Sequence, residues 1–190
     1  MHQWVLWVLV AASALHVVEE HALGWQGWAS EEFGKRFGVR PTWADFWATN
    51  AALIVFGVAC AMVGWKAVGF SLALPALVLI NAVGFHILPS LKAGAPNPGV
   101  FSAVILYVPI GIWAYVAAAA DDRLSFGGFL LSVLVGAAVM ASALGMLILG
   151  RDYGYADSDD AEASGPPPIP QRAATNDGDD ADDAEEPDGD

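Results

Sequence analysis

Residues 43–65 read WADFWATNAALIVFGVACAMVGW, an apolar stretch with one acidic residue, Asp45, near its start. A helix needs about 20 apolar residues to cross the hydrocarbon core of a bilayer, so this stretch is long enough to span a membrane. Three similar stretches follow at residues 67–88, 100–120 and 126–149. Together they predict an all-α polytopic membrane protein.

A fifth apolar stretch runs from residue 3 to residue 15 and then meets the polar sequence HVVEEH at 16–21. We interpret residues 4–28 as one helix, the first of five predicted transmembrane helices. A cleavable signal peptide is the alternative for this segment. However, its first residues contain no Lys or Arg, and its apolar run leads into paired glutamates, so we favour the helix.

The composition separates a membrane domain from the C-terminal end of the chain. Hydrophobic residues make up 56% of the sequence and charged residues only 15%. Of the 21 acidic residues, 14 lie in residues 151–190, among Pro, Ser, Gly and Ala. Such a segment buries too little apolar surface to offset its ordering entropy. We therefore predict a transmembrane domain at 1–150 and a disordered acidic tail at 151–190. The single cysteine, Cys60, excludes an internal disulfide and a cysteine-built zinc site.

The Lys and Arg residues of the predicted loops indicate an orientation in the cell membrane. One side of a five-crossing arrangement carries Lys35, Arg36, Arg40, Lys92, Arg151 and Arg172, and the other carries Lys66 and Arg123. We expect the N-terminus outside, the C-terminus in the cytoplasm, and membrane lipids as partners. A nucleic-acid partner is not expected, because the basic residues form no extended cluster.

Residues 30–38 predict a short helix that lies on the membrane surface. Ser30 is the expected N-cap, and two Glu residues each precede a Lys or Arg by four positions. The same spacing places Phe33 over Phe37. An apolar face beside a charged face is typical of an interfacial helix.

The polar residues of the first helix are candidates for a functional site, because ionisable groups inside a bilayer are costly unless paired or hydrated. At 100° per residue, His16 and Glu20 lie about 40° apart and Glu19 about 60° to the other side, so the three share one face. His21 points away from them. His16 and Glu20 can bind one metal ion, or they can form an acid/base pair with Glu19 as the partner carboxylate. Alternatively, the cluster only holds helices together.

Polar residues of the other predicted helices are expected at a similar depth. Asn81 and His86 lie five residues apart, about 140° around an α-helix, so they need not contact the same ligand. Asn50 and Ser102 are expected as supporting groups, although Asn50 can instead bond between helices and Ser102 can cap a helix. The candidate catalytic residues are His16, Glu19, Glu20, Asn81 and His86. Of these, His16, Glu20 and His86 are candidate ligands of a divalent iron, zinc or manganese ion.

These motifs resemble the membrane protein family named for its HXXEE motif. HVVEE at 16–20 matches that motif, and NAVGFH at 81–86 resembles the second signature of the family, Asn-Ala followed by His. PGVFS at 98–102 resembles the third, aromatic-x-Pro-Gly-x-x-Thr, with Pro96 in place of the aromatic residue and Ser102 in place of threonine. The resemblance covers residues 1–150 and implies a membrane enzyme, for a family without an established activity.

Three classes of function fit this pattern. The first is a membrane-embedded enzyme that acts on a lipidic or isoprenoid-like substrate. The second is a proton- or cation-coupled carrier, in which the same residues form a relay. The third is a non-catalytic accessory protein. We favour the enzyme, because many carriers are built from duplicated halves and this sequence has no obvious repeat.

Overall fold

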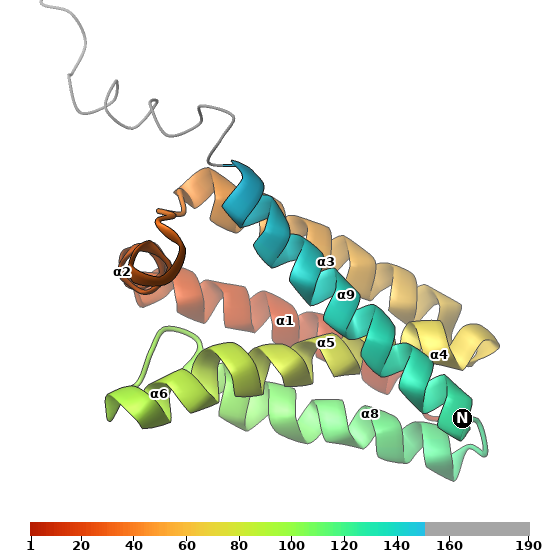
Figure 1. Ribbon diagram of the computed structural model, residues 1–190. Coiled ribbons are helices and arrows are strands. Elements are labelled where there is room, and N and C mark those ends of the chain that lie inside the picture. Colours follow the sequence, from red (N-terminus) through yellow and green to blue (C-terminus); the bar gives the residue numbers. More distant parts are fainter. Residues whose placement is uncertain (151–190) are drawn as a thin grey trace, which may run out of the picture. The chain divides into compact units, whose positions relative to one another are not determined.

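The computed structural model describes residues 1–150, which form helices joined by short connections and contain no strand (Figure 1). Five of these helices are long and apolar enough to cross a membrane: Val5–Ala22, Trp43–Ser71, Ala73–Ala93, Val100–Ala120 and Phe126–Ile148. The predicted all-helical fold is confirmed, and so is the expected number of long apolar helices. The predicted acidic tail, residues 151–190, lies outside the described residues.

The elements follow one another along the bundle as α1 (Val5–Ala22), α2 (Trp25–Phe37) and α3 (Trp43–Val63). The chain then reverses through η1 (Gly64–Ala67) and α4 (Val68–Ser71). It returns through α5 (Ala73–Asn81), the π-helical segment η2 (Ala82–Ile87) and α6 (Leu88–Ala93). The fourth long helix comprises α7 (Val100–Ser102), the π-helical segment η3 (Ala103–Tyr107) and α8 (Val108–Ala120), and α9 (Phe126–Gly150) is the fifth.

Each π-helical segment is followed closely by a proline. Pro89 comes two residues after η2, and Pro109 comes two residues after η3. A proline has no N–H, so the carbonyl four residues before it loses its usual helical partner. Wider turns that close over five residues are rare, and where they occur inside α-helices they are frequently found at functional sites. Segments η2 and η3 contact each other inside the bundle.

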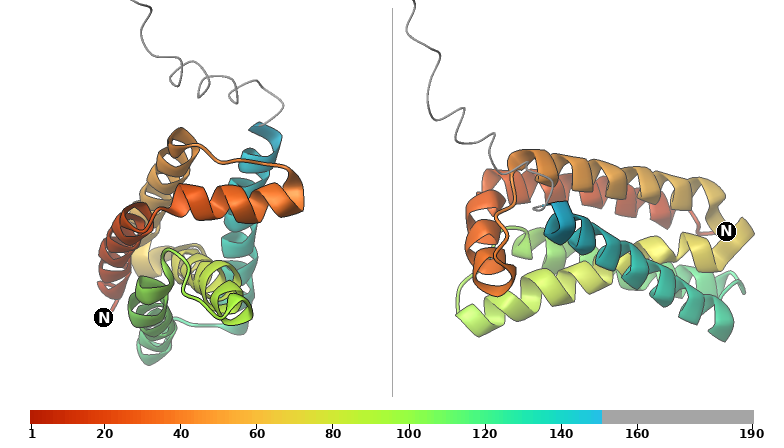
Figure 2. Two further views of the ribbon diagram at one scale, coloured as in Figure 1. Left: turned by 90° about the vertical axis from the view of Figure 1, so that its left-hand side faces the viewer. Right: turned by 45° about the horizontal axis from the view of Figure 1, so that its top comes forward.

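The prediction that residues 4–28 form one helix is wrong. Helix α1 ends at Ala22, and Gly24 adopts a left-handed φ of +73° before α2 begins at Trp25. Glycine takes this conformation easily because it has no Cβ, so the chain can turn sharply at this residue. Helix α2 then runs across the end of the bundle (Figure 2). The helix predicted at 30–38 is the second half of α2, and Ser30 is therefore not its N-cap.

Helix α2 has the two faces that its sequence predicts. Phe33 is buried, and its ring centroid lies 6.3 Å from that of Phe37. On the exposed face, Lys35 Nζ donates a 2.6 Å hydrogen bond to Glu31, and Arg36 forms an ion pair with Glu32. The predicted spacings of four residues are thus confirmed as contacts.

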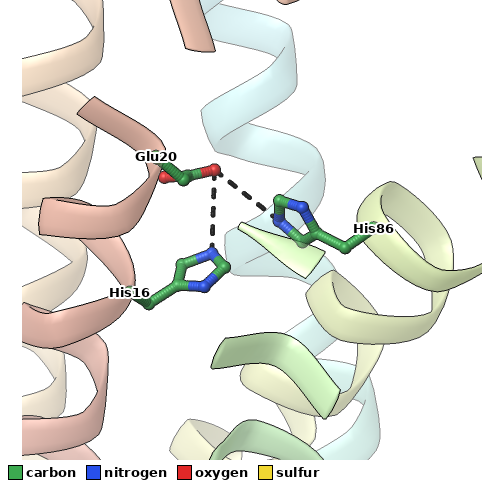
Figure 3. A group of neighbouring side chains, drawn as sticks. All are labelled: His16, Glu20 and His86. Atoms are coloured by element: carbon green, nitrogen blue, oxygen red, sulfur yellow. Dashed lines mark ion pairs between the residues drawn. The ribbon is translucent and has the colours of Figure 1, made fainter. Parts of the chain in front are cut away.

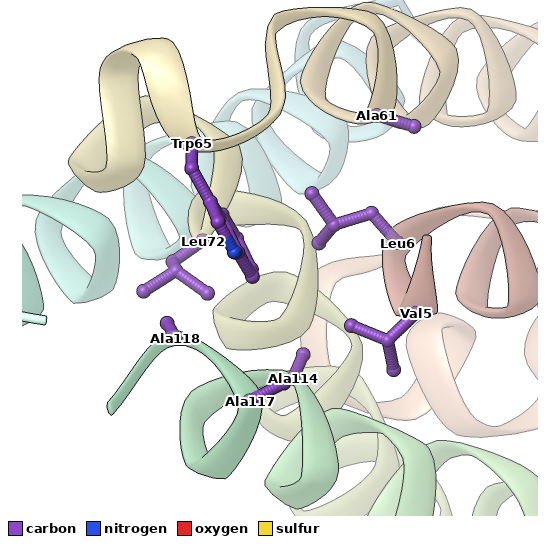
Figure 4. Packing of buried hydrophobic residues seen from close by; sticks show 8 residues of the cluster. All are labelled: Val5, Leu6, Ala61, Trp65, Leu72, Ala114, Ala117 and Ala118. Carbon is purple, nitrogen blue, oxygen red and sulfur yellow. The ribbon is translucent and has the colours of Figure 1, made fainter. Parts of the chain in front are cut away.

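Small residues allow α9 to pack closely on α5. A Cβ added at Gly136 would lie 2.8 Å from the Cβ of Ala76 and 2.9 Å from the carbonyl oxygen of Ala73. Glycine therefore lets one helix approach the backbone of the other. At the end of the bundle that holds η1, an apolar cluster joins α1, α3, η1 and α8 (Figure 4). Its members are Val5, Leu6, Ala61, Trp65, Leu72, Ala114, Ala117 and Ala118.

Candidate functional site

Three buried side chains from two distant parts of the sequence meet inside the bundle (Figure 3). His16 and Glu20 lie one turn apart on α1, and His86 reaches them from η2. Glu20 Oε1 is 3.6 Å from His16 Nε2 and 3.6 Å from His86 Nε2. The exposed fractions of His16, Glu20 and His86 are only 1%, 5% and 1%. The two histidines and the carboxylate therefore face one small space that is shielded from the surroundings.

The spacing of these atoms suits a metal ion better than it suits direct hydrogen bonds. A separation of 3.6 Å is longer than an N–H···O hydrogen bond, which averages about 2.9 to 3.0 Å. Two ligands bound at about 2.0 to 2.1 Å on a tetrahedral ion lie about 3.3 Å apart. One ligand atom from each of the three residues lies within 4.8 Å of the other two. Two imidazole nitrogens and one carboxylate oxygen form a donor set that zinc, iron and manganese all accept.

The π-helical turn changes the predicted relation between Asn81 and His86. On an α-helix they would point about 140° apart. Because η2 closes its turns over five residues, the two side chains instead line the same cavity. Asn81 Oδ1 is buried and has no hydrogen-bond partner. Asn81 and His86 therefore both belong to the wall of this cavity, although Asn81 is not one of the three residues that converge.

A cavity of about 100 Å³ adjoins the cluster at Glu20 and His86. Side chains from α1, α2, α3, α5, η2 and α9 line it, and most of them are aromatic or aliphatic. The apolar lining comprises Trp25, Trp28, Phe33, Phe46, Leu53, Phe85, Met140, Ala143, Leu144 and Leu147, and the other polar lining residues are Asp45, Thr49, Asn50 and Asn81. A second cavity of about 20 Å³, lined in part by His16, Asn50 and Asn81, has room for about one water molecule.

The two glutamates of the motif contact different partners. Whereas Glu20 faces the histidines, the carboxylate of Glu19 accepts hydrogen bonds from the backbone N–H groups of Phe101 at 3.1 Å and Ser102 at 2.7 Å. Glu19 thus caps the start of the fourth long helix, where a negative charge is favourable. It is not among the three residues that converge, although the sequence grouped it with them.

Ser102 contacts the cluster directly. Its Oγ lies 2.7 Å from His16 Nδ1 and also donates a 3.3 Å hydrogen bond to the carbonyl oxygen of Gly99. Asn50 donates from its amide to the carbonyl oxygen of Phe46 at 3.0 Å and lines both cavities. The two predicted supporting residues therefore differ: Ser102 touches a candidate ligand, and Asn50 shapes the wall.

Sequence reasoning missed Asn97 and Tyr107. Asn97 is 4% exposed, and its amide donates a 2.8 Å hydrogen bond to the carbonyl oxygen of Phe85, which Pro89 leaves without a helical partner. The ring of Tyr107 lies against that of His16, with centroids 4.4 Å apart. Asn97 stands in a connection and Tyr107 in an apolar run, so neither position carries a signal in the sequence.

His21 lies outside the cluster, as the helical wheel predicts. Its ring packs against those of Trp43, Phe46 and Trp47 on α3, with centroid distances of 4.6, 6.4 and 5.2 Å. The side chain is exposed. His21 is therefore a matched control for His16, because both histidines stand on the same helix.

Comparison with known proteins agrees with the motifs. A family model described as "Protein of unknown function with HXXEE motif" matches residues 7–114, which include the three convergent residues, Asn97 and Ser102. No curated protein and no solved structure matches the chain. On the extent of this match, the chain belongs to the HXXEE-motif family, whose function is unknown.

Proposed function

We propose that this protein is a membrane-embedded enzyme in which His16, Glu20 and His86 hold a divalent metal ion beside a lipidic substrate. The observation that carries this proposal is the convergence of two imidazole nitrogens and one carboxylate oxygen in a buried space next to an apolar cavity. A buried polar cluster that served packing alone would be expected to pair its atoms. Here His16 Nε2 and Asn81 Oδ1 both lack hydrogen-bond partners.

The lining of the 100 Å³ cavity favours a lipidic substrate. Ligand sites are commonly apolar with a few polar groups that fix the orientation, and this lining has both. One wall belongs to α9, whose apolar span is only 11% buried inside the bundle. A helix with so much apolar surface outside the protein is suited to contact lipid tails. A lipidic molecule that passes beside α9 would reach Glu20 and His86 without entering water.

Each residue then has a distinct role. A bound divalent ion would polarise an oxygen atom of the substrate. Asn81 Oδ1, which is buried and unpaired, can accept a hydrogen bond from a hydroxyl or amide group of the substrate. Trp25 and Trp28, from α2, line the cavity, and their apolar rings would limit the access of water to a bound substrate.

The metal site is tested by elemental analysis of the full chain, purified in a mild detergent without chelator. We expect a divalent ion at near-stoichiometric amount in the wild type. Glu20→Gln should lose most of it, because glutamine keeps the shape of the side chain but not its charge. His16→Ala should lose it too, whereas the control His21→Ala should retain it.

Two outcomes would contradict the proposal. One is a wild-type protein that holds no metal even after incubation with Zn²⁺, Fe²⁺ and Mn²⁺. The other is a Glu20→Gln variant with wild-type metal content. If the metal-free protein instead moved protons across liposomes, the carrier would replace the enzyme.

We also propose an orientation with α2 at the cytoplasmic face. Arg36 and Lys92 lie at the end of the bundle that α2 crosses, and Lys66 and Arg123 lie at the opposite end (Figure 1). The positive-inside rule favours the cytoplasm for the more basic end. In a Cys60→Ala background, a membrane-impermeant thiol reagent added to intact cells should label Ser125→Cys and not Ser158→Cys. Labelling at position 158 alone would reverse the orientation.

A further inference from the structure

One short segment, residues 97–102, contacts both candidate histidines at once. Its midpoint is Gly99, at a φ of +92°. A Cβ added at Gly99 would lie 2.6 Å from His86 Cε1 and 2.8 Å from His16 Cε1. These separations are too short for any other residue, so the backbone of the segment rests directly against both imidazole rings.

The His16 half of this contact is a complete hydrogen-bond chain. The Ser102 hydroxyl has one proton, which it donates to the carbonyl oxygen of Gly99. Its oxygen can therefore accept the Nδ1–H of His16, which lies 2.7 Å away. With the proton on Nδ1, the Nε2 atom of His16 has a free lone pair directed toward Glu20.

Glu19 holds this half in place. Its two carboxylate oxygens accept the backbone N–H groups of Phe101 and Ser102. Helix α7, which contains Ser102, is therefore bound to α1 at the residue before Glu20. The two consecutive glutamates therefore have different contacts. Glu20 faces the two histidines, whereas Glu19 binds the backbone beside Ser102, which contacts His16.

Next to His86, Asn97 offers an acceptor oxygen that corresponds to the Ser102 hydroxyl beside His16. Asn97 is fixed by two hydrogen bonds, from its amide to the carbonyl oxygen of Phe85 and from its backbone N–H to Ser90 Oγ at 3.0 Å. Because the amide nitrogen is engaged, the atom left over is the acceptor Oδ1, which is buried and unpaired. The ring of His86 lies next to the side chain of Asn97 and the backbone of Pro98, and its Nδ1 is buried without a hydrogen bond of normal length.

We infer that residues 97–102 orient both histidines through their Nδ1 atoms, Ser102 holding His16 and Asn97 holding His86, so that both Nε2 atoms face Glu20. This inference rests on the proposed metal site and adds positioning residues to it. Metal-binding histidines almost always donate their other N–H to an oxygen, which fixes the tautomer and the ring direction. In His86, the corresponding hydrogen bond would join the Nδ1–H group to Asn97 Oδ1.

The test compares variants of equal shape, in the full chain in detergent, with Co²⁺ as the probe. Ser102→Thr keeps the hydroxyl and Ser102→Val removes it, so any loss from the branched side chain is common to both. Co²⁺ affinity should fall about 10- to 100-fold in Ser102→Val and change little in Ser102→Thr. The absorption spectrum of bound Co²⁺ should change in the valine variant alone. Ser132→Ala, a buried serine away from the site, is the control.

Asn97 is tested in the same way. Asn97→Asp keeps an acceptor oxygen and Asn97→Leu does not, so the leucine variant should lose more affinity. Equal Co²⁺ affinity and equal spectra within each pair would overturn the inference while leaving the metal site intact. A wild-type protein that binds no Co²⁺ would overturn the metal site and the inference together.

Discussion

The two ends of the bundle differ in how their polar side chains are paired. At the end that holds η1, the carboxylate of Asp121 accepts hydrogen bonds from the Trp65 indole N–H at 2.8 Å and from the backbone N–H of His2. The amide oxygen of Gln3 accepts the backbone N–H of Trp65 at 3.1 Å. Beside this network lies the apolar cluster of Figure 4. The side chains of Gln3, Trp65 and Asp121 thus form hydrogen bonds with one another or with the backbone, beside a tightly packed apolar cluster.

At the other end, buried polar atoms are left unpaired. Within residues 1–150, the buried side-chain atoms without a partner are His16 Nε2, Asn81 Oδ1, His86 Nδ1 and Asn97 Oδ1. All four belong to the site or to its immediate supports. Unpaired buried polar atoms cost free energy and are rare, so their concentration here is informative. This difference supports the proposal that the site end binds a ligand, whereas the paired groups and the apolar cluster at the η1 end contribute to the stability of the bundle.

The largest effect on stability is expected from Trp65→Ala. Trp65 is 5% exposed and packs among Leu6, Leu72 and Ala114. Its truncation should cost about 3 to 5 kcal/mol of unfolding free energy, as for other buried large side chains. Metal content should not change, because the site is at the opposite end. Unfolding in mixed micelles, with elemental analysis of the same samples, measures both. Trp7→Ala, at a site 47% exposed, is the control and should cost much less.

A change at Gly99 should affect the site end instead. Gly99→Ala would force a Cβ against both histidine rings and should cost about 1 to 3 kcal/mol, as overpacking does, together with most of the bound metal. Gly84→Ala is the matched control, because Gly84 stands in η2 beside His86 with open space around it. Retained metal in Gly99→Ala would contradict the close contact between residues 97–102 and the rings.

A smaller effect is expected from acid at the η1 end. The hydrogen bond from the His2 backbone N–H, followed by that from the Trp65 indole, lowers the pKa of Asp121 from its usual value. A carboxyl whose pKa is lower in the folded state stabilises the fold above its unfolded pKa and loses this contribution as pH falls. The melting temperature should therefore decrease below about pH 4. This decrease should be shallower in Asp121→Asn; an identical pH profile in the variant would show that Asp121 does not contribute.

The smallest effect is expected on the exposed face of α2. Lys35 and Glu31 form an ion pair in which both side chains are exposed, the pKa of Glu31 being lowered and that of Lys35 raised by their hydrogen bond. Such pairs contribute little to stability and are screened by salt. Lys35→Gln should leave the melting temperature unchanged at low and high salt. A clear drop would mean that α2 depends on its charged face and not on buried Ala29 and Phe33.

The sequence alone determined whatever depends on local spacing. Apolar runs of membrane length predicted the long helices. The bounds of the fourth and fifth agree closely with those observed, whereas the boundary between the second and third, predicted near residue 66, lies near residue 72. The spacing of four residues predicted that His16 and Glu20 share one helix face and that Glu31 contacts Lys35. The helical wheel also predicted that His21 points away from that face. These relations hold because a regular helix fixes directions within one element.

Only the tertiary structure decided which elements meet and where the helix is irregular. Gly24 looked like one glycine in an apolar run, yet it turns α2 across the bundle, since a left-handed residue redirects everything after it. The wheel separated Asn81 from His86, but the π-helical turn before Pro89 brings them to one cavity. Glu19 and Glu20 look equivalent in the motif, and their roles diverge because Ser102 and His86 approach α1 on different sides. Such contacts join residues more than 60 positions apart, and no local pattern encodes them.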